Sequence, residues 1–243
     1  MTPTKKGSCI AKGGYNEEKH ILSIIYDFID YALLKLGFEK IRCNNAKQIV
    51  GTKKSDIQVG PVNIQVKKTT GIFGQVGRYW IDKLVSIIPD LSNVSYILKK
   101  TWEFPVVDNK CVRTNCKFNN FSNKELLNLV DTLEKTKIDI LKFAFLGDNP
   151  EYYPDLFLVS YYKNNTRNKI IVWKTMDIID YIAEFPVRIR ERGTVIEFGP
   201  AFTMQRKGGD SGNPTANQLQ FKLGSNWLLK DPDFVKKAFV YYF

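Results

Sequence analysis

The sequence predicts a mixed α/β fold with a central sheet flanked by helices, formed by a single domain over residues 1–243. Segments with apolar residues at helical spacing alternate along the chain with short segments that have strand-like two-residue alternation. The chain is 44% hydrophobic and 25% charged, which excludes a disordered, collagen-like or coiled-coil protein. Its length allows a sizeable core, and no repeat or low-complexity linker divides it.

The first helix is expected over residues 16–36. Its apolar residues recur every three or four positions, as on one buried helix face: Ile21, Ile24, Ile25, Phe28, Ile29, Ala32, Leu33 and Leu36. Gly37 is expected to end this helix, because glycine readily adopts the left-handed conformation found after many helices. Residues 40–55 follow and carry five basic residues and no acidic one.

Two strands are expected next, over residues 56–59 and 62–67. Both segments alternate apolar and polar residues, and Gly60-Pro61 separates them as a turn would. Residues 71–77 are rich in glycine and are expected to form a loop. Residues 79–88 are expected to form a helix.

The rest of the chain continues the alternation of helices and strands. A helix is expected over residues 122–133, because Ser122 and Glu125 have the spacing of a capping box. Two strands joined by a polar turn are expected over residues 156–162 and 169–173. A helix is expected over residues 175–183, and a further strand over residues 194–198.

Candidate catalytic residues lie on the first strand pair. Gln65 and Lys67 share one face of their strand, because strand side chains alternate, and Asp56 can lie beside them across the turn. An acid followed by an oxygen ligand and a lysine is typical of metal-dependent phosphodiester hydrolysis. We expect Asp56 and Gln65 to hold Mg²⁺ and Lys67 to orient or help deprotonate the attacking water. The alternative is an ordinary charged hairpin.

The neutral amide of Gln65 lowers the negative charge of this site, so another carboxylate should help to hold the metal. Glu18, near the start of the first helix, is the first candidate, and Glu17 is the second.

Several segments have the composition of a DNA-binding surface. Arg188, Arg190 and Arg192 alternate, so an extended segment would present them on one face to phosphates. Two further segments, at residues 74–78 and 205–217, offer side chains that hydrogen-bond to base edges: Gln75, Arg78, Gln205, Arg206, Lys207, Asp210, Asn213 and Asn217. The alternatives are a charged edge strand and a solvated surface loop.

Charge and composition narrow the class of protein. Thirty-six Lys and Arg against 25 Asp and Glu give a net charge of +11, which favours polyanions such as nucleic acid. The four cysteines are scattered and the only histidine is His20, so neither a disulfide framework nor a zinc site is expected. The first twelve residues lack the apolar stretch of a secretory signal. A cytoplasmic protein without a membrane partner is expected.

These residues together resemble one family. Residues 205–210 with Gly212, 215–217 and 219–222 are similar to the C-terminal signature of HinP-type type II restriction endonucleases, which cut GCGC. Residues 55–57 and 63–67 are similar to the catalytic segments of that family, and they include its unusual glutamine.

The resemblance implies a PD-(D/E)xK restriction-endonuclease-like core and Mg²⁺-dependent cleavage of double-stranded DNA at a short palindrome, with GCGC as the best estimate. It implies that Asp56, Gln65 and Lys67 are catalytic, that Glu18 is accessory and that Gln75 enters the minor groove. The catalytic core would span about residues 11–100, and the recognition elements about 71–80 and 186–222. A methyltransferase would be a functional partner without a stable complex, and the enzyme would be a monomer or a homodimer.

Two other functions fit the residues. One is a repair or mismatch nickase with the same fold. The other is a basic DNA-binding protein without catalysis, in which the Asp, Gln and Lys residues form a structural hairpin.

Overall fold

The computed structural model describes most of the chain: residues 3–38, 45–51, 53–69, 74–100, 102–103, 106–107, 110–111, 114–115, 118–164, 166–190, 193–206 and 218–243. The chain forms two compact units, each assembled from separate stretches. Unit 1 comprises residues 1–74, 145–178 and 225–243, and unit 2 comprises residues 75–144 and 179–224. That residues 1–243 form one nuclease domain stays a prediction, because this division does not show whether either unit folds alone.

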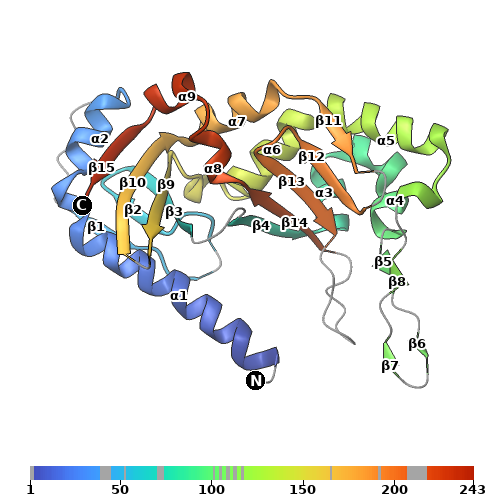
Figure 1. Ribbon diagram of the computed structural model, residues 1–243, viewed down its shortest axis with the longest axis horizontal. Helices are drawn as coiled ribbons and strands as arrows, with labels where there is room; N and C mark the ends of the chain where they lie inside the picture. The colour runs from blue at the N-terminus through green and yellow to red at the C-terminus, as the bar shows by residue number, and fades with distance from the viewer. Residues whose placement is uncertain are drawn as a thin grey trace. The chain divides into compact units, whose positions relative to one another are not determined.

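Unit 1 is built around a six-stranded mixed sheet (Figure 1). In spatial order its strands are β1 (Ala46–Gln48), β2 (Ile57–Val59), β3 (Val62–Thr69), β9 (Leu156–Lys163), β10 (Thr166–Lys174) and β15 (Phe239–Tyr242). Strands β3 and β9 pair in parallel, whereas the other neighbours pair antiparallel. The predicted strand pair is therefore confirmed, as β2 and β3.

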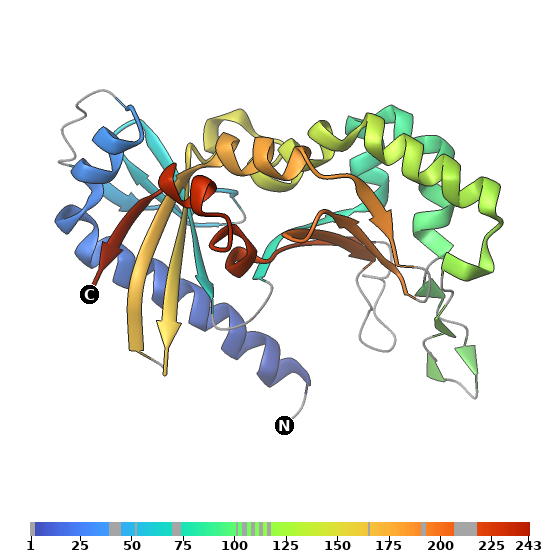
Figure 2. The same ribbon diagram turned by 45° about the horizontal axis from the view of Figure 1, so that its top comes forward.

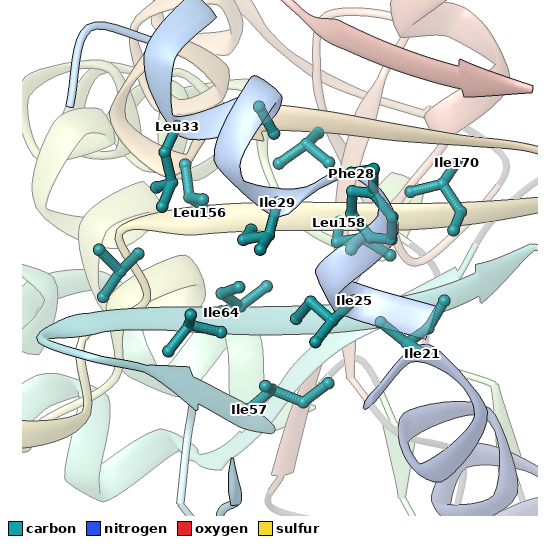
Figure 3. Close-up of a cluster of buried hydrophobic side chains, with 14 of the residues drawn as sticks. Ile21, Ile25, Phe28, Ile29, Leu33, Ile57, Ile64, Leu156, Leu158 and Ile170 are labelled. Atoms are coloured by element: carbon teal, nitrogen blue, oxygen red, sulfur yellow. The ribbon is translucent and has the colours of Figure 1, made fainter. Parts of the chain in front are cut away.

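The N-terminal helical segment packs its apolar face on this sheet. It consists of α1 (Pro3–Ile24), a 3₁₀ turn η1 (Ile25–Asp27) and α2 (Ile29–Lys35). Figure 3 shows that its side chains meet those of the sheet in one cluster, in which the following are buried: Ile21, Ile25, Phe28, Ile29, Leu33, Ile57, Ile64, Leu156, Leu158 and Ile170. The predicted apolar face is confirmed. The helix begins earlier than predicted, because the apolar period that marked it starts only at Ile21, and the 3₁₀ turn interrupts it.

Gly37 closes this segment as predicted. Its φ is +73°, in the left-handed region that favours glycine. Its N–H donates to Leu34 O at 3.1 Å, and the N–H of Phe38 donates to Leu33 O at 2.9 Å. This is the Schellman pattern, which pairs carbonyls that a helix end would otherwise leave exposed.

The remaining elements of unit 1 are short. They are η4 (Pro150–Tyr152), α8 (Ser225–Leu228) and α9 (Pro232–Lys236), and α7 (Thr175–Ala183) carries the chain from unit 1 into unit 2. The predicted strands at 156–162 and 169–173 and the predicted helix at 175–183 are confirmed as β9, β10 and α7.

Unit 2 contains a five-stranded sheet with helices gathered on one side of it (Figure 2). The spatial order of the strands is β11 (Val187–Ile189), β12 (Val195–Phe198), β13 (Phe202–Arg206), β14 (Gln218–Leu223) and β4 (Gly74–Trp80). Phe143 belongs to a helix, and its ring lies 4.2 Å from the ring of Tyr79 of β4, measured between centroids. The Tyr79 ring lies 6.1 Å from the ring of Phe221 of β14. A helix therefore covers this face of the sheet.

The helical elements of unit 2 are α3 (Ile81–Ile87), η2 (Pro89–Val94), α4 (Ser95–Lys100), η3 (Phe118–Asn120), α5 (Asn123–Lys135) and α6 (Lys137–Leu146), the last of which runs on into unit 1. Two strand pairs join β5 (Trp102–Glu103) to β8 (Thr114–Asn115) and β6 (Val106–Val107) to β7 (Lys110–Cys111). The capping box of α5 is confirmed, since Ser122 Oγ accepts from the Glu125 N–H and the Glu125 carboxylate accepts from the Ser122 N–H. The predicted strand at 194–198 is confirmed as β12.

One predicted loop is wrong. Residues 74–77 belong to strand β4, and the helix expected over residues 79–88 begins only at Ile81. The glycines in this segment are typical of loops, but pairing with β14 holds it extended, and a tertiary contact of this kind leaves no local pattern. Residues 71–73 lie outside the described residues. Within the described ranges, no helix is both long and apolar enough to cross a membrane.

A matched pair of glycine substitutions tests this architecture. Gly37→Ala should destabilise the chain by about 1–2 kcal/mol, because a Cβ is strained in the left-handed region. Gly14→Ala should stabilise it by about 0.5–1 kcal/mol, because Gly14 lies within α1 and a Cβ there meets no atom within 4 Å. Urea denaturation measures both effects, and a loss of stability at position 14 would contradict the helix.

Candidate active site

Strand β3 separates the core from the candidate site. Ile64 and Val66 are buried against the helical segment, at 0% and 5% exposure. The alternating residues Gln65 and Lys67 therefore lie on the other face of the strand. The predicted placement of these two side chains on one face agrees with the strand that the structure forms.

Asp56 lies beside β3, immediately before β2. Its N–H donates to Ile64 O at 2.9 Å, and its Oδ2 accepts from the Val66 N–H at 2.7 Å. The same oxygen lies 3.7 Å from Lys67 Nζ. Both side chains remain partly exposed, so an acid and a lysine are held together within reach of a ligand. The sequence predicts this proximity from the length of the turn.

The Gln65 side chain is 3% exposed and is anchored to the segment that carries Asp56. Its Nε2 donates to Lys54 O at 2.9 Å. Its Oε1 is buried and, within the described ranges of the chain, has no hydrogen-bond partner. A buried carbonyl oxygen without a partner is costly, and coordination of a cation would offset that cost. The donor set therefore fits a hard divalent cation, which binds oxygen ligands.

Glu18 also belongs to this site. The Nε2 of Gln48, on β1, donates to its Oε2 at 2.8 Å. Burial raises the pKa of Glu18, and the negative charge of Asp56 raises it further, while Gln48 and Lys67 oppose the change. Two carboxylates that repel each other in this way would both be stabilised by a bound cation.

Glu17, the second candidate for the accessory acid, has a different set of partners. Its carboxylate is 4% exposed and pairs with Arg167 Nη2 at 2.7 Å. Tyr162 Oη donates to it at 2.6 Å, and Arg167 Nε donates to Ser160 Oγ at 2.8 Å. These bonds tie α1 to β9 and β10. Glu17 thus has a structural ion pair, and Glu18 is the acid that interacts with Asp56.

Burial alone would raise the pKa of Glu17. The hydrogen bonds from Tyr162 and Ser160 and the charge of Arg167 outweigh it, and they hold the pKa below its ordinary value of 4.5.

Lys54 and Gln48 are two site residues that the sequence did not single out. Burial lowers the pKa of Lys54 well below its ordinary value, and the charge of Lys67 lowers it further, against the effect of Asp56. Lys54 lies in the basic stretch noted in the sequence, but composition alone gives no reason to separate it from its neighbours. Gln48 lies on a three-residue strand that is too short to show a period.

The candidate cation ligands of the site are the carboxylates of Asp56 and Glu18 and the amide oxygen of Gln65. Across the part of the chain that the structure describes, no group of three or more His, Cys, Asp or Glu side chains could hold a metal. Any cation here would therefore depend on the Gln65 oxygen as well as on Asp56 and Glu18.

The described candidates for DNA contact lie in unit 2. Gln75 and Arg78 are exposed on β4, and Arg188 is exposed on β11. Arg190 follows β11 and is paired with Glu197, with Nε and Nη2 at 2.6 and 2.5 Å from Oε1. Residues 187–189 are extended, and Arg192 lies outside the described residues, so that these arginines face phosphates stays a prediction.

The second predicted recognition segment is only partly described. Gln205 and Arg206 belong to β13 and not to a loop, and the Arg206 side chain is buried. Lys207, Asp210, Asn213 and Asn217 lie outside the described residues. These assignments stay predictions.

Comparison with known proteins identifies relatives of the chain. The model of a family described as R.HinP1I restriction endonuclease matches residues 37–229. The crystal structure of the restriction endonuclease MspI in complex with its cognate DNA is similar, with a TM-score of 0.62 and 13% identity over 91% of this chain and 93% of MspI. No curated protein sequence matches. At this identity the structural likeness concerns the fold, and it confirms the predicted restriction-endonuclease-like α/β fold.

The buried ion pair predicts an acid-sensitive stability. Because the pKa of Glu17 is lowered in the folded state, its contribution is complete above the ordinary value of 4.5 and is lost as the pH falls through the lower folded value. Glu17→Gln should cost about 3–5 kcal/mol at pH 7, since Arg167 is left buried without a counter-charge.

Urea denaturation between pH 3 and 7 measures this effect. The variant should lose less stability on acidification than the wild type. Glu151→Gln removes an exposed carboxylate of the same unit and serves as the control, which should follow the wild-type curve. Equal slopes for Glu17→Gln and the wild type would contradict the assigned ion pair.

Proposed function

The chain belongs to the R.HinP1I restriction endonuclease family, and we propose that it hydrolyses both strands of duplex DNA at a short palindromic site in a Mg²⁺-dependent reaction. Restriction endonucleases cleave DNA at specific sequences. GCGC is the best estimate of the site, from the similarity of residues 205–222 to the signature of the family.

One observation carries the catalytic assignment. Asp56 Oδ2 and Lys67 Nζ lie 3.7 Å apart at the edge of a buried strand pair, and the Gln65 oxygen beside them has no hydrogen-bond partner among the residues that the structure describes. A structural hairpin would gain nothing from a buried carbonyl oxygen that is left unpaired. A cation-binding hydrolytic site accounts for all three side chains.

Each side chain has a distinct role in the proposed reaction. Asp56 and Gln65 would hold Mg²⁺, with Glu18 as the accessory acid. Bound Mg²⁺ supplies positive charge that stabilises the developing charge on the phosphoryl oxygens. The ammonium of Lys67 attracts the scissile phosphate and orients the attacking water, and its positive charge favours the loss of a proton from that water to solvent. Water attacks phosphorus in line with the bond that breaks.

Lys54 is a second lysine at the same site. Its lowered pKa follows from burial and from the charge of Lys67, so the two lysines compete for the negative charge of Asp56. A phosphate that approaches them would relieve this repulsion. The site is therefore suited to an anionic substrate even though it contains two carboxylates.

Duplex binding is proposed to rest on the basic excess. The net charge is +11, and Arg78 and Arg188 are exposed cationic side chains in unit 2. Contacts of this kind displace counterions from DNA, so the affinity should fall steeply with salt. A separate methyltransferase that protects the same sites is the proposed functional partner, without a stable complex. The active form is proposed to be a monomer or a homodimer.

Lys67→Ala should reduce the cleavage rate by a factor of at least about 10³, because the charge that orients water and phosphate is lost. Duplex affinity should change little. Digestion of a plasmid in Mg²⁺ measures cleavage, and a mobility-shift titration in Ca²⁺ measures binding. Lys163→Ala removes an exposed lysine at the end of β9 and is expected to cut normally.

The outcomes separate the alternatives. Discrete double-strand fragments support a restriction enzyme, and sequencing their ends returns the site and the position of the cuts. Nicks confined to mismatched or damaged DNA would indicate a repair enzyme. Binding without cleavage by the wild type would indicate a non-catalytic DNA-binding protein. Undiminished cleavage by Lys67→Ala would show that the catalytic assignment is wrong.

Gln65→Glu tests the proposed metal ligand without relying on activity. Without metal the variant should be less stable by about 1–3 kcal/mol, because a carboxylate oxygen replaces the Nε2 that donates to Lys54 O. Mg²⁺ should raise its melting temperature more than that of the wild type, because a carboxylate binds the cation more strongly. Thermal unfolding in Mg²⁺ and in NaCl of equal ionic strength measures this. Equal shifts for both proteins would exclude Gln65 as a ligand.

A further inference from the structure

Three glutamine side chains form a hydrogen-bonded chain across three neighbouring strands of unit 2. Gln205 of β13 and Gln220 of β14 are directly opposite in the antiparallel register. Gln205 Nε2 donates to Gln220 Oε1 at 3.4 Å, and Gln220 Nε2 donates to Gln75 Oε1 of β4 at 2.6 Å. Both hydrogen bonds of this amide chain are therefore donated toward Gln75, where the amide chain ends.

This amide chain lies on the polar side of the sheet. Phe221 is fully buried, and its ring contacts those of Phe202 and Tyr79. The neighbouring Gln220 points to the opposite face, because strand side chains alternate. Gln75 is exposed, whereas Gln205 and Gln220 are partly exposed. The end of the chain is thus open to a ligand while its middle is held between two strands.

The direction of these hydrogen bonds determines whether Gln75 offers a donor or an acceptor to a ligand. A glutamine amide has one acceptor oxygen and one donor nitrogen. The Gln75 oxygen accepts from Gln220, so its outward group is the Nε2 donor. Without Gln220 the amide could rotate by half a turn and offer either group. In the minor groove, where the resemblance places Gln75, a fixed donor can pair with the N3 and O2 acceptors but not with the guanine N2–H₂ donor, whereas a fixed acceptor would pair with that donor.

We propose that Gln220 is a positioning residue that determines sequence preference: it fixes the amide of Gln75 so that Gln75 presents a hydrogen-bond donor to acceptor atoms on a base edge. This inference rests on the proposed function, since it requires that unit 2 contacts DNA bases. It adds a residue that acts through Gln75 and does not itself touch the DNA.

Gln220→Glu reverses the hydrogen bond to Gln75 and keeps the one that Gln205 donates. A carboxylate has only acceptor oxygens, so both Gln205 and Gln75 would donate to it through Nε2. Gln75 would then present Oε1 outward and favour bases that offer a donor. The side chain keeps its size and both hydrogen bonds, so the sheet should tolerate the change. The preference at the base pair that Gln75 contacts should shift by about tenfold or more.

The experiment is cleavage of a duplex library with randomised sites, followed by sequencing of the cut ends. Gln220→Glu should change the base frequencies at one symmetric pair of positions and leave the others as in the wild type. Gln220→Met, which cannot fix the amide, should make those positions degenerate. Lys222→Gln lowers the net charge by the same single unit two residues along the same face and serves as the matched control. It should slow cleavage of all sequences alike.

The results separate this inference from the proposed function. Failure of the wild type to cut any library member would overturn the proposed function, and the inference with it. Wild-type cutting together with unchanged base frequencies in Gln220→Glu, or an even loss across all sequences, would overturn the inference alone.

A second variant keeps the inference testable if Gln220→Glu proves unfolded by thermal melting. In Gln205→Glu, the amide of Gln220 would rotate so that its Nε2 donates to the new carboxylate. The amide of Gln75 would then rotate to donate to Gln220 Oε1, and Gln75 would again present its oxygen outward. The shift in preference should be similar in kind and smaller, because this bond is the longer of the two. Base frequencies identical to those of the wild type would then overturn the proposal.

Discussion

The register of strand β3 is the constraint on which unit 1 depends. A slip by one residue would turn Ile64 and Val66 out of the core and turn Gln65 and Lys67 into it. The Asp56 carboxylate holds that register on one side by accepting from the Val66 N–H. On the other side, Asp155 accepts from the Asn63 N–H and its own N–H donates to Asn63 O. The proposed metal ligand Asp56 thus also fixes the strand that carries its neighbours.

Neutral glutamines recur where charged residues would be costly. At position 65 an amide supplies an oxygen without a third negative charge beside Asp56 and Glu18, whose pKa is already raised. In unit 2, the hydrogen-bonded amides that end at Gln75 fix a donor direction without net charge on the face proposed to approach DNA. In both places the amide supplies oriented hydrogen-bonding groups without adding a charge.

Local patterns predicted unit 1 better than unit 2. The alternation around Gln65 and the turn at Gly60-Pro61 are short-range signals, so β2, β3 and the proximity of Asp56 to Lys67 could be predicted. The partners of Glu18 could not, because Gln48 is thirty residues away on a strand without a period. Strand β4 was missed because its pairing with β14 joins segments separated by more than a hundred residues. The amide chain depends on the same pairing and has no local signature.

The chain crosses between the two units at residues 74/75, 144/145, 178/179 and 224/225, so unit 2 consists of two insertions into unit 1. The proposed catalytic residues belong to the interrupted unit, and the described candidates for base contact belong to the insertions. A change of specificity by exchange of unit 2 would require both insertions to be replaced together, with all four junctions kept. A single crossover between the two insertions would join β4 of one protein to strands β11–β14 of another. Point substitution within that sheet is therefore the more accessible evolutionary route to a new recognition sequence.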